Sequence, residues 1–168
     1  MSQSTLAISF FFHLVATVVW VGGLVILALL VWPETRRILA SSPPLYALLT
    51  RLRKRFFPLA NLSLAVLIVT GLFQMTANPN YDGALTFNNQ WSQVMLLKHI
   101  AFAGMVISGL LLQFGVAPAL ERASLLAERG KGDAVEWEGL RRREVRLTWL
   151  NVGLGLLVLA FTAWATAL

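Results

Sequence analysis

Residues 6–32 read LAISFFFHLVATVVWVGGLVILALLVW, an apolar run without a charged side chain. A transmembrane helix needs about 20 consecutive apolar residues, and this run exceeds that length. Three further apolar stretches follow, at 57–75, 94–118 and 147–168. Backbone polar groups in lipid must be satisfied within the segment, so each stretch is predicted to form a membrane-spanning α-helix. The first run is too long, and its N-terminal flank too free of charge, for a cleaved signal peptide.

The composition agrees with this prediction and excludes several other classes of protein. Of the 168 residues, 57% are hydrophobic and 13% are charged, whereas about a quarter of the residues in an ordinary soluble domain are charged. The chain has no cysteine, which excludes disulfides, thiolate metal sites and thioether-linked haem. We therefore expect one transmembrane domain, 1–168, and neither a cytosolic enzyme nor a secreted disulfide scaffold.

The basic residues predict how the helices are oriented. The N-terminal tail and the second connection carry none, and Lys98 is the only one on the outer half. By the positive-inside rule, the first and third connections face the cytoplasm and both termini face outside. We expect an all-α integral membrane protein, an up-down four-transmembrane-helix bundle whose net charge of +6 reflects topology and lipid contact rather than nucleic-acid binding. The other 13 basic residues are Arg36, Arg37, Arg51, Arg53, Lys54, Arg55, Arg122, Arg129, Lys131, Arg141, Arg142, Arg143 and Arg146.

The connections are expected to continue the helices beyond the membrane. Residues 45–56 form a basic helical approach to the second span, and 119–129 and 134–146 extend the third and fourth spans on either side of a glycine-containing break. The second connection, 76–93, is polar and rich in turn residues. Within the spans, five polar residues are expected to form interhelical hydrogen bonds: Asn61, Thr70, Gln74, Asn151 and Thr162.

The chain has two histidines, and both lie within predicted spans. His13 lies roughly 10 Å and His99 roughly 8 Å along its helix from the outer end. The first and third helices run in the same direction, so the two imidazoles are expected at similar depth. Diagonal histidines in a four-helix bundle can clamp a flat metal macrocycle. Ionisable residues inside a membrane are costly and usually functional, which favours a cofactor role over a purely structural one.

Small and aromatic residues accompany both histidines on their helix faces. Ala16 and Ala103, one turn inward, would leave room for a plate-like cofactor. Ordinary membrane helix packing explains the same residues equally well. Lys98 has two interpretations: its long stem reaches the outer head groups, or its ammonium pairs with a propionate or serves as another axial ligand. The aromatic residues expected to line the cofactor are Phe10, Trp20 and Phe102.

Two methionines near the outer end allow a copper site as an alternative. Met75 closes the second span, and Met95 precedes His99 by four residues on the same helix face. With His13 and His99 they would form a thioether and imidazole set that suits copper. Filling of the hydrophobic core is the other interpretation of both methionines.

Several short motifs of this chain form a pattern seen in known membrane proteins: HLVATVVWVGG at 13–23, the basic run before the second span, Thr70-Gly71-Leu72, Trp91 and Leu97-Lys98. By these motifs the chain resembles the copper-resistance protein D family, a group of bacterial integral membrane proteins. It is also similar in layout to the small four-helix, haem-binding protoporphyrinogen oxidases of bacteria, and that likeness implies His13 as a haem ligand and Lys98 as the counterpart of the oxidase lysine. Unlike the oxidases, this chain has His99 directly after Lys98 and a Val-Gly-Gly stretch after Trp20.

From these observations the leading expectation is a b-type haem protein of the bacterial cytoplasmic (inner) membrane. One haem, ligated by His13 and His99, would transfer electrons near the outer face to or from a quinol or another membrane or periplasmic redox protein. The chain would then be an oxidoreductase component, as an oligomer or as a subunit of a larger complex. The family resemblance implies copper binding or transport as the alternative, and a membrane scaffold without a cofactor is the third.

Overall fold

The computed structural model describes residues 2–26, 28–29, 43–83 and 86–168. Long helical segments dominate these ranges, and the described part of the chain contains no β-strand. The all-α fold predicted from the sequence is therefore confirmed. The end of the predicted first span at 30–32, and Arg36 and Arg37 of the first connection, lie outside the described residues.

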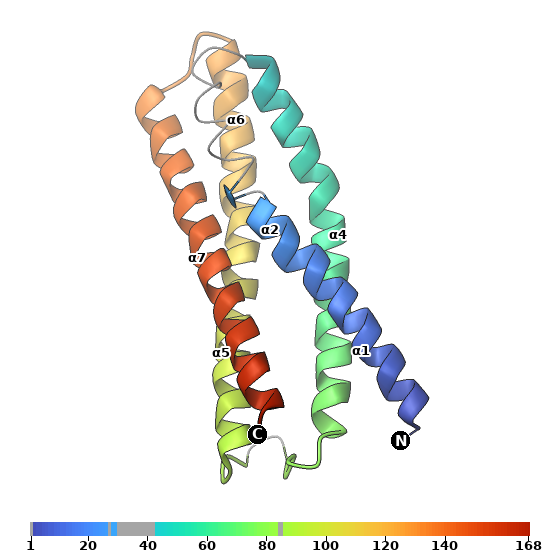
Figure 1. Cartoon of the computed structure of the whole chain (residues 1–168). Helices are drawn as coiled ribbons and strands as arrows, with labels where there is room; N and C mark the ends of the chain where they lie inside the picture. The colour runs from blue at the N-terminus through green and yellow to red at the C-terminus, as the bar shows by residue number, and fades with distance from the viewer. Residues whose placement is uncertain (1, 27, 30–42, 84–85) are drawn as a thin grey trace.

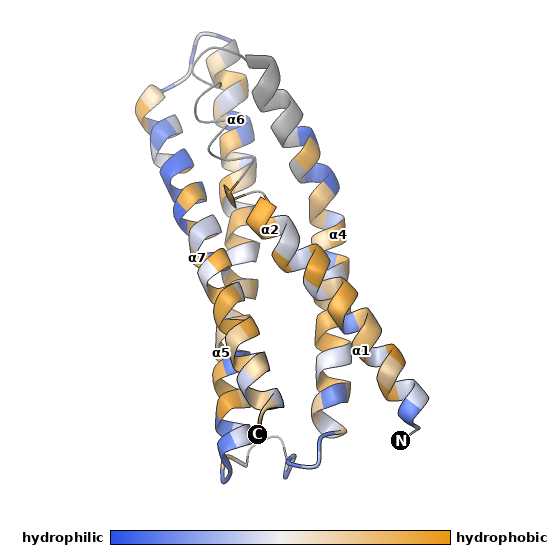
Figure 2. Cartoon of the chain, viewed as in Figure 1, coloured by the Kyte–Doolittle hydropathy of each residue, from blue (hydrophilic) through white to orange (hydrophobic). Residues whose placement is uncertain are grey.

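Four long helical segments follow one another along the chain (Figure 1). Each contains a stretch long and apolar enough to cross a membrane: Gln3–Ile26, Lys54–Thr76, Gln90–Ala127 and Ala134–Thr166. Figure 2 shows that apolar residues dominate the middle of these helices. The elements are α1 (Gln3–Thr17), η1 (Val18–Gly22, a π-helix), α2 (Gly23–Ile26), α4 (Pro43–Thr76), α5 (Gln90–Leu110), η3 (Leu111–Val116, a π-helix), α6 (Ala117–Glu128) and α7 (Ala134–Thr166).

The charged extensions of the spans are helical, as the sequence predicts. Residues 45–56 are part of α4, 119–128 are part of α6, and α7 begins directly after Asp133. The Asp133 side chain caps α7 by accepting a hydrogen bond from the backbone N–H of Val135 at 2.8 Å, and Asn89 caps α5 by accepting from Ser92 at 2.7 Å. Such side-chain oxygens satisfy backbone N–H groups that a helix start leaves without partners.

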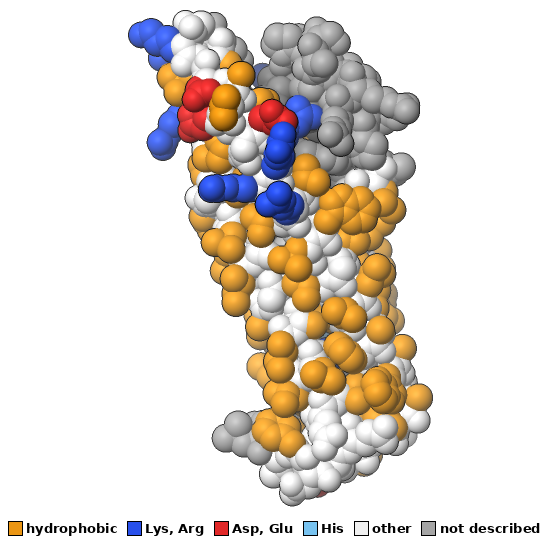
Figure 3. Space-filling model, turned by 90° about the vertical axis from the view of Figure 1, so that its left-hand side faces the viewer, with side chains coloured by type: hydrophobic (Ala, Val, Ile, Leu, Met, Phe, Trp, Pro, Cys, Tyr) orange, Lys and Arg blue, Asp and Glu red, His pale blue; other side chains and the backbone are white. Residues whose placement is uncertain are grey.

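The helices alternate in direction, which confirms the up-down arrangement. Both termini and the connecting residues 77–83 and 86–89 lie at one end of the molecule, and the turn at 129–133 lies at the other (Figure 1). Charged side chains gather at the end with this turn, above a wall of hydrophobic side chains (Figure 3). We call the end with the termini the outer end, following the positive-inside rule.

The bundle consists of two helix pairs, α1 with α4 and α5 with α7. In the second pair, α5 presents a stripe of buried residues with spacings of three, four and seven: Trp91, Val94, Ala101, Met105 and Ser108. Gly155 of α7 lies against this stripe, since a Cβ atom there would be 3.4 Å from the terminal methyl of Met105. Small residues at such positions allow membrane helices to approach closely.

A buried amide joins the same pair of helices. Asn151 of α7 is 1% exposed. In the amide orientation that satisfies both of its polar atoms, it donates to the Met105 carbonyl at 3.1 Å and accepts from the Gly109 N–H at 3.2 Å. The predicted interhelical role of Asn151 is therefore confirmed. Thr162 instead donates to the Val158 carbonyl of its own helix.

The two pairs meet near the middle of the bundle. Trp20 of η1 packs against Phe102 of α5 with ring centroids 6.3 Å apart. Within the first pair, Gly23 faces the ring of Phe56 so closely that a Cβ atom at position 23 would overlap it. Gly23 therefore allows α2 and α4 to approach closely.

Candidate functional site

His13 faces α4 from the middle of α1. Its Nδ1 atom lies 2.7 Å from the hydroxyl oxygen of Thr70. Gly71 is close beside the ring, because a Cβ atom there would be 3.5 Å from the Cε1 atom of His13. The side chain is neither fully buried nor exposed. Thr70, predicted to form an interhelical hydrogen bond, therefore does so with the one histidine of the first span.

A second polar contact lies one turn nearer the outer end. The Gln74 amide of α4 donates to the Ser9 hydroxyl of α1 at 3.3 Å. Ser9 and His13, and likewise Thr70 and Gln74, are four residues apart, so each pair lies on one face of its helix. The α1–α4 contact thus carries two polar bridges in an otherwise apolar interface. Asn61, the third polar residue predicted to bridge helices from this span, is exposed.

Lys98 and His99 are adjacent in sequence but have different surroundings. Lys98 is partly buried. His99 is exposed, and its Nδ1 atom contacts the Met95 carbonyl of its own helix at 2.6 Å. The structure therefore does not gather the two histidines into one buried site.

The helix face of α5 explains this difference. The buried positions Trp91, Val94, Ala101 and Met105 define the side that packs within the bundle. Position 98 continues their spacing, four residues after 94 and three before 101. His99 is rotated by about 100° from that side. The packing of the buried residues along α5 therefore determines that Lys98, rather than His99, is on the side that faces the bundle.

The other residues predicted to surround a cofactor also fall into two groups, one buried within the bundle and one exposed. Ala16 and Trp20 of the first span are buried, at 4% and 8% exposure. Phe102 is partly buried and packs on Trp20, whereas Phe10 and Ala103 are exposed. Ala103 lies one turn from His99 and shares its outward face. Of these residues, Ala16, Trp20 and Phe102 therefore lie on the sides of their helices that pack within the bundle.

Met75 and Met95 pack against the same hydrophobic cluster at the outer end of the bundle. Both are partly buried and pack against one hydrophobic cluster that contains Trp91, Val94 and Ala165. Tyr81 and Phe161 pack against the same cluster. Met75 of α4 and Met95 of α5 therefore border the same cluster. Among the described residues, no group of three or more histidine and carboxylate side chains gathers as a metal site.

One residue of the polar α1–α4 interface was not predicted as a functional group. Ser9 is 9% exposed and pairs with Gln74. Its position four residues before His13 was the available signal, since a buried serine one turn from an intramembrane histidine shares its helix face. Its partner could not be identified from one helix alone, because pairing depends on how α1 and α4 are placed against each other.

The fold and the apolar helix surfaces define a multi-pass membrane protein of the helical-bundle class. The model of the copper resistance protein D family matches residues 50–165, more than two thirds of the chain. The chain belongs to this family. The match includes Met75, Met95 and Lys98 and begins after His13. No curated protein and no solved structure matches the chain.

Proposed function

We propose that this protein binds copper(I) at the outer end of its bundle, in the bacterial inner membrane, with the thioethers of Met75 and Met95 as ligands. The observation that carries the proposal is their convergence on one cluster from two different spans. Membership in a family named for copper resistance supports copper as the metal. Soft thioether sulfur is a preferred ligand of copper(I).

The surroundings of the two methionines suit a soft cation. Neutral sulfur ligands need no deprotonation, and the aromatic side chains of Trp91, Tyr81 and Phe161 pack around the same cluster. Aromatic faces attract cations through their electron-rich rings. His13 lies deeper, because its partner Thr70 is five residues, roughly 7.5 Å, along α4 from Met75. Copper would therefore meet the sulfur atoms before the imidazole.

Conservative methionine variants test this proposal. We expect Met75→Leu and Met95→Leu each to weaken copper(I) binding at least about tenfold, since each removes a ligand and retains the side-chain volume. Met105→Leu is the matched control, because Met105 is buried in the same helix, against Gly155. Affinity is measured by competition with a copper(I) chelator. Unchanged affinity in both variants would contradict the proposed ligands.

Haem binding is the second candidate, and the partly buried positions of His13 and Lys98 within their spans favour it. His13 would ligate the iron, and Lys98 would neutralise a propionate or provide the other ligand. Haem would supply one-electron transfer there. The predicted pair of histidine ligands fits less well, because His99 is exposed on another face of α5. That ligand pair, and the exchange of electrons with a quinol or a redox protein, remain predictions.

The variant Lys98→Leu separates the two candidates by the sign of its effect. An ammonium group repels a cation bound in the same bundle, because like charges repel more strongly in a medium of low dielectric constant than in water. Removing the Lys98 ammonium should therefore tighten copper(I) binding. The same change should weaken haem binding, because an anionic propionate would lose its partner. The absorption spectrum of the purified protein, with a metal assay, shows which group is bound.

A further inference from the structure

The hydrogen bonds around Thr70 determine which nitrogen of His13 carries the proton. The Thr70 hydroxyl lies 2.6 Å from the Val66 carbonyl, to which it donates. A carbonyl oxygen can only accept, so the single hydroxyl proton of Thr70 is committed to that bond. The contact of 2.7 Å between Thr70 and Nδ1 of His13 must then be a bond in which Nδ1–H donates.

This arrangement leaves the other ring nitrogen of neutral His13 without a proton. A neutral imidazole has one N–H, and here it lies on Nδ1. The Nε2 atom then presents a lone pair. Metal-binding histidines commonly use such an arrangement, in which one nitrogen donates to a neighbouring oxygen and the other is the ligand. The backbone of α1 is also tied locally, since Thr17 donates to the His13 carbonyl at 2.8 Å.

We propose that Thr70 is a positioning residue that holds His13 in the Nδ1–H tautomer, so that Nε2 is a ready metal ligand. The Val66 carbonyl, the Thr70 hydroxyl and the His13 imidazole form a relay from α4 to α1. This role goes beyond the proposed copper site at the methionines. It applies equally to a copper ion that passes from the methionines to His13 and to the iron of a haem.

The presence of only two histidines makes the tautomer directly measurable. The full chain, labelled with ¹⁵N-histidine and placed in lipid nanodiscs, gives ring resonances for His13 and His99, and a His99→Gln variant assigns them. Protonated and bare ring nitrogens have well-separated ¹⁵N chemical shifts. We expect His13 to show a protonated Nδ1 and a bare Nε2.

Variants of Thr70 test its role. Thr70→Val keeps the shape but removes the hydroxyl, and it should give a mixture of tautomers at His13. Thr70→Ser retains the hydroxyl and should restore the single tautomer. Thr162→Val is the matched control, because the Thr162 hydroxyl also donates to a carbonyl four residues earlier, at 2.7 Å, without a histidine beside it. A Thr70→Val protein that keeps a pure Nδ1–H tautomer would overturn the proposal.

Two probes test the ligand role of Nε2 on the same resonance. Silver(I) stands in for copper(I) without redox chemistry, and zinc protoporphyrin stands in for haem without paramagnetism. One of them should shift the Nε2 resonance of the wild-type protein, and Thr70→Val should require about tenfold more of it. If neither probe shifts the resonance, the ligand role is overturned. That outcome would not contradict the proposed copper site at the methionines, because the probed atom belongs to His13. The methionine site is tested separately by the variants Met75→Leu and Met95→Leu.

Discussion

The rings of Trp20 and Phe102 lie with their centroids 6.3 Å apart and their planes tilted by 51°. They belong to the first and third spans, whereas the principal packing partners of these spans are the second and fourth. The contact therefore connects the two helix pairs of the bundle. It brings together one residue from each of the two predicted cofactor faces, although His99 and Ala103 of the second face are exposed.

Replacing Trp20 should separate the two helix pairs. We expect Trp20→Ala to lower the free energy of unfolding by about 3 kcal/mol, because a large buried side chain is lost. A double-mutant cycle with Phe102→Leu should show a coupling of about 0.5–1.5 kcal/mol. Unfolding in detergent measures both values. Trp164→Ala is the control, since Trp164 is 50% exposed, and an equal loss there would contradict a specific role for Trp20.

The orientation in the membrane can be measured because the natural chain has no cysteine. We expect a single cysteine at Ser4 to react with a membrane-impermeant thiol reagent in intact cells. A cysteine at Lys131, in the turn between α6 and α7, should react only after the membrane is opened. We expect this orientation because the first and third connections carry thirteen basic residues, and basic connections remain on the cytoplasmic side. Labelling of position 131 from outside would reverse the orientation.

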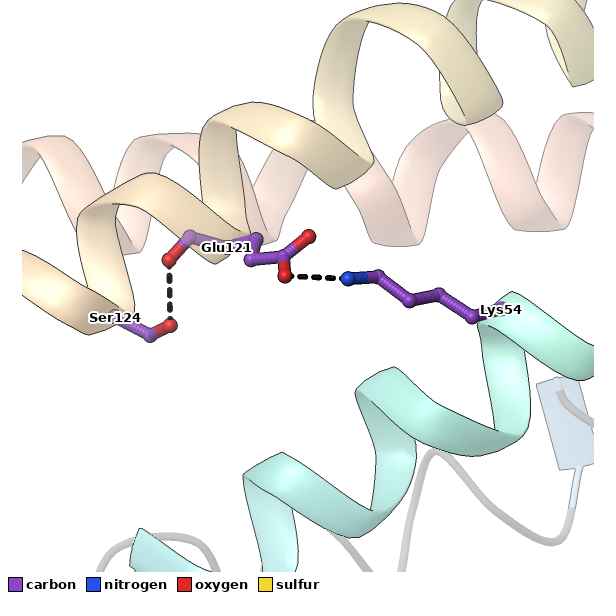
Figure 4. Close-up of polar contacts among 3 residues, drawn as sticks. All are labelled: Lys54, Glu121 and Ser124. Atoms are coloured by element: carbon purple, nitrogen blue, oxygen red, sulfur yellow. Dashed lines mark hydrogen bonds and ion pairs between the residues drawn. The ribbon is translucent and has the colours of Figure 1, made fainter.

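An ion pair joins α4 to α6 at the charged end of the bundle. The Nζ atom of Lys54 lies 2.6 Å from Oε1 of Glu121 (Figure 4). Both side chains are partly exposed, so we expect Lys54→Ala to reduce the free energy of unfolding by less than about 1 kcal/mol. The loss should shrink at high salt. The exchange Lys54→Glu with Glu121→Lys should recover most of the stability that either reversal alone loses.

The amide of Asn151 should matter more than that ion pair, because it is buried. Asn151→Leu removes its bonds to the Met105 carbonyl and the Gly109 N–H of α5. We expect a loss of about 1–2 kcal/mol in the free energy of unfolding. Thr162→Val, which changes a bond within one helix, should cost less. Equal losses in the two variants would argue against an interhelical contribution from Asn151.

The fold follows from the sequence because a membrane leaves a chain few alternatives. Four apolar runs of sufficient length must become helices, and the basic residues between them predict alternating directions. The helical, charged extensions of the third and fourth spans could also be predicted, since the glycines at 130 and 132 and Asp133 mark a break between two helical stretches. These features depend on short-range sequence, so they do not require knowledge of how the helices pack.

The candidate site could be predicted only in part from the sequence, because it depends on how each helix is rotated about its own axis. Histidine chemistry favoured His99 as the partner of His13, but position 98, and not 99, continues the spacing of the buried residues of α5. The spacing of Trp91, Val94, Ala101 and Met105 contained this information. The convergence of Met75 and Met95 could be predicted only as an alternative, since it requires α4 and α5 to end at the same level. The bond between His13 and Thr70 likewise depends on how α1 and α4 are placed.

The π-helix η3 has a further consequence for the charged end of the third span. A π turn takes in one residue more than an α turn. Before this π-helix, the buried positions include 101, 105 and 108. If burial continued to repeat every seven residues, positions 115, 119 and 122 would be buried. The buried residues are instead Val116, Leu120 and Ala123, one position later, and Arg122 is exposed. The extra residue in the π turn moves the buried face of the helix by one position. It thereby keeps the guanidinium group of Arg122 out of the hydrophobic interior.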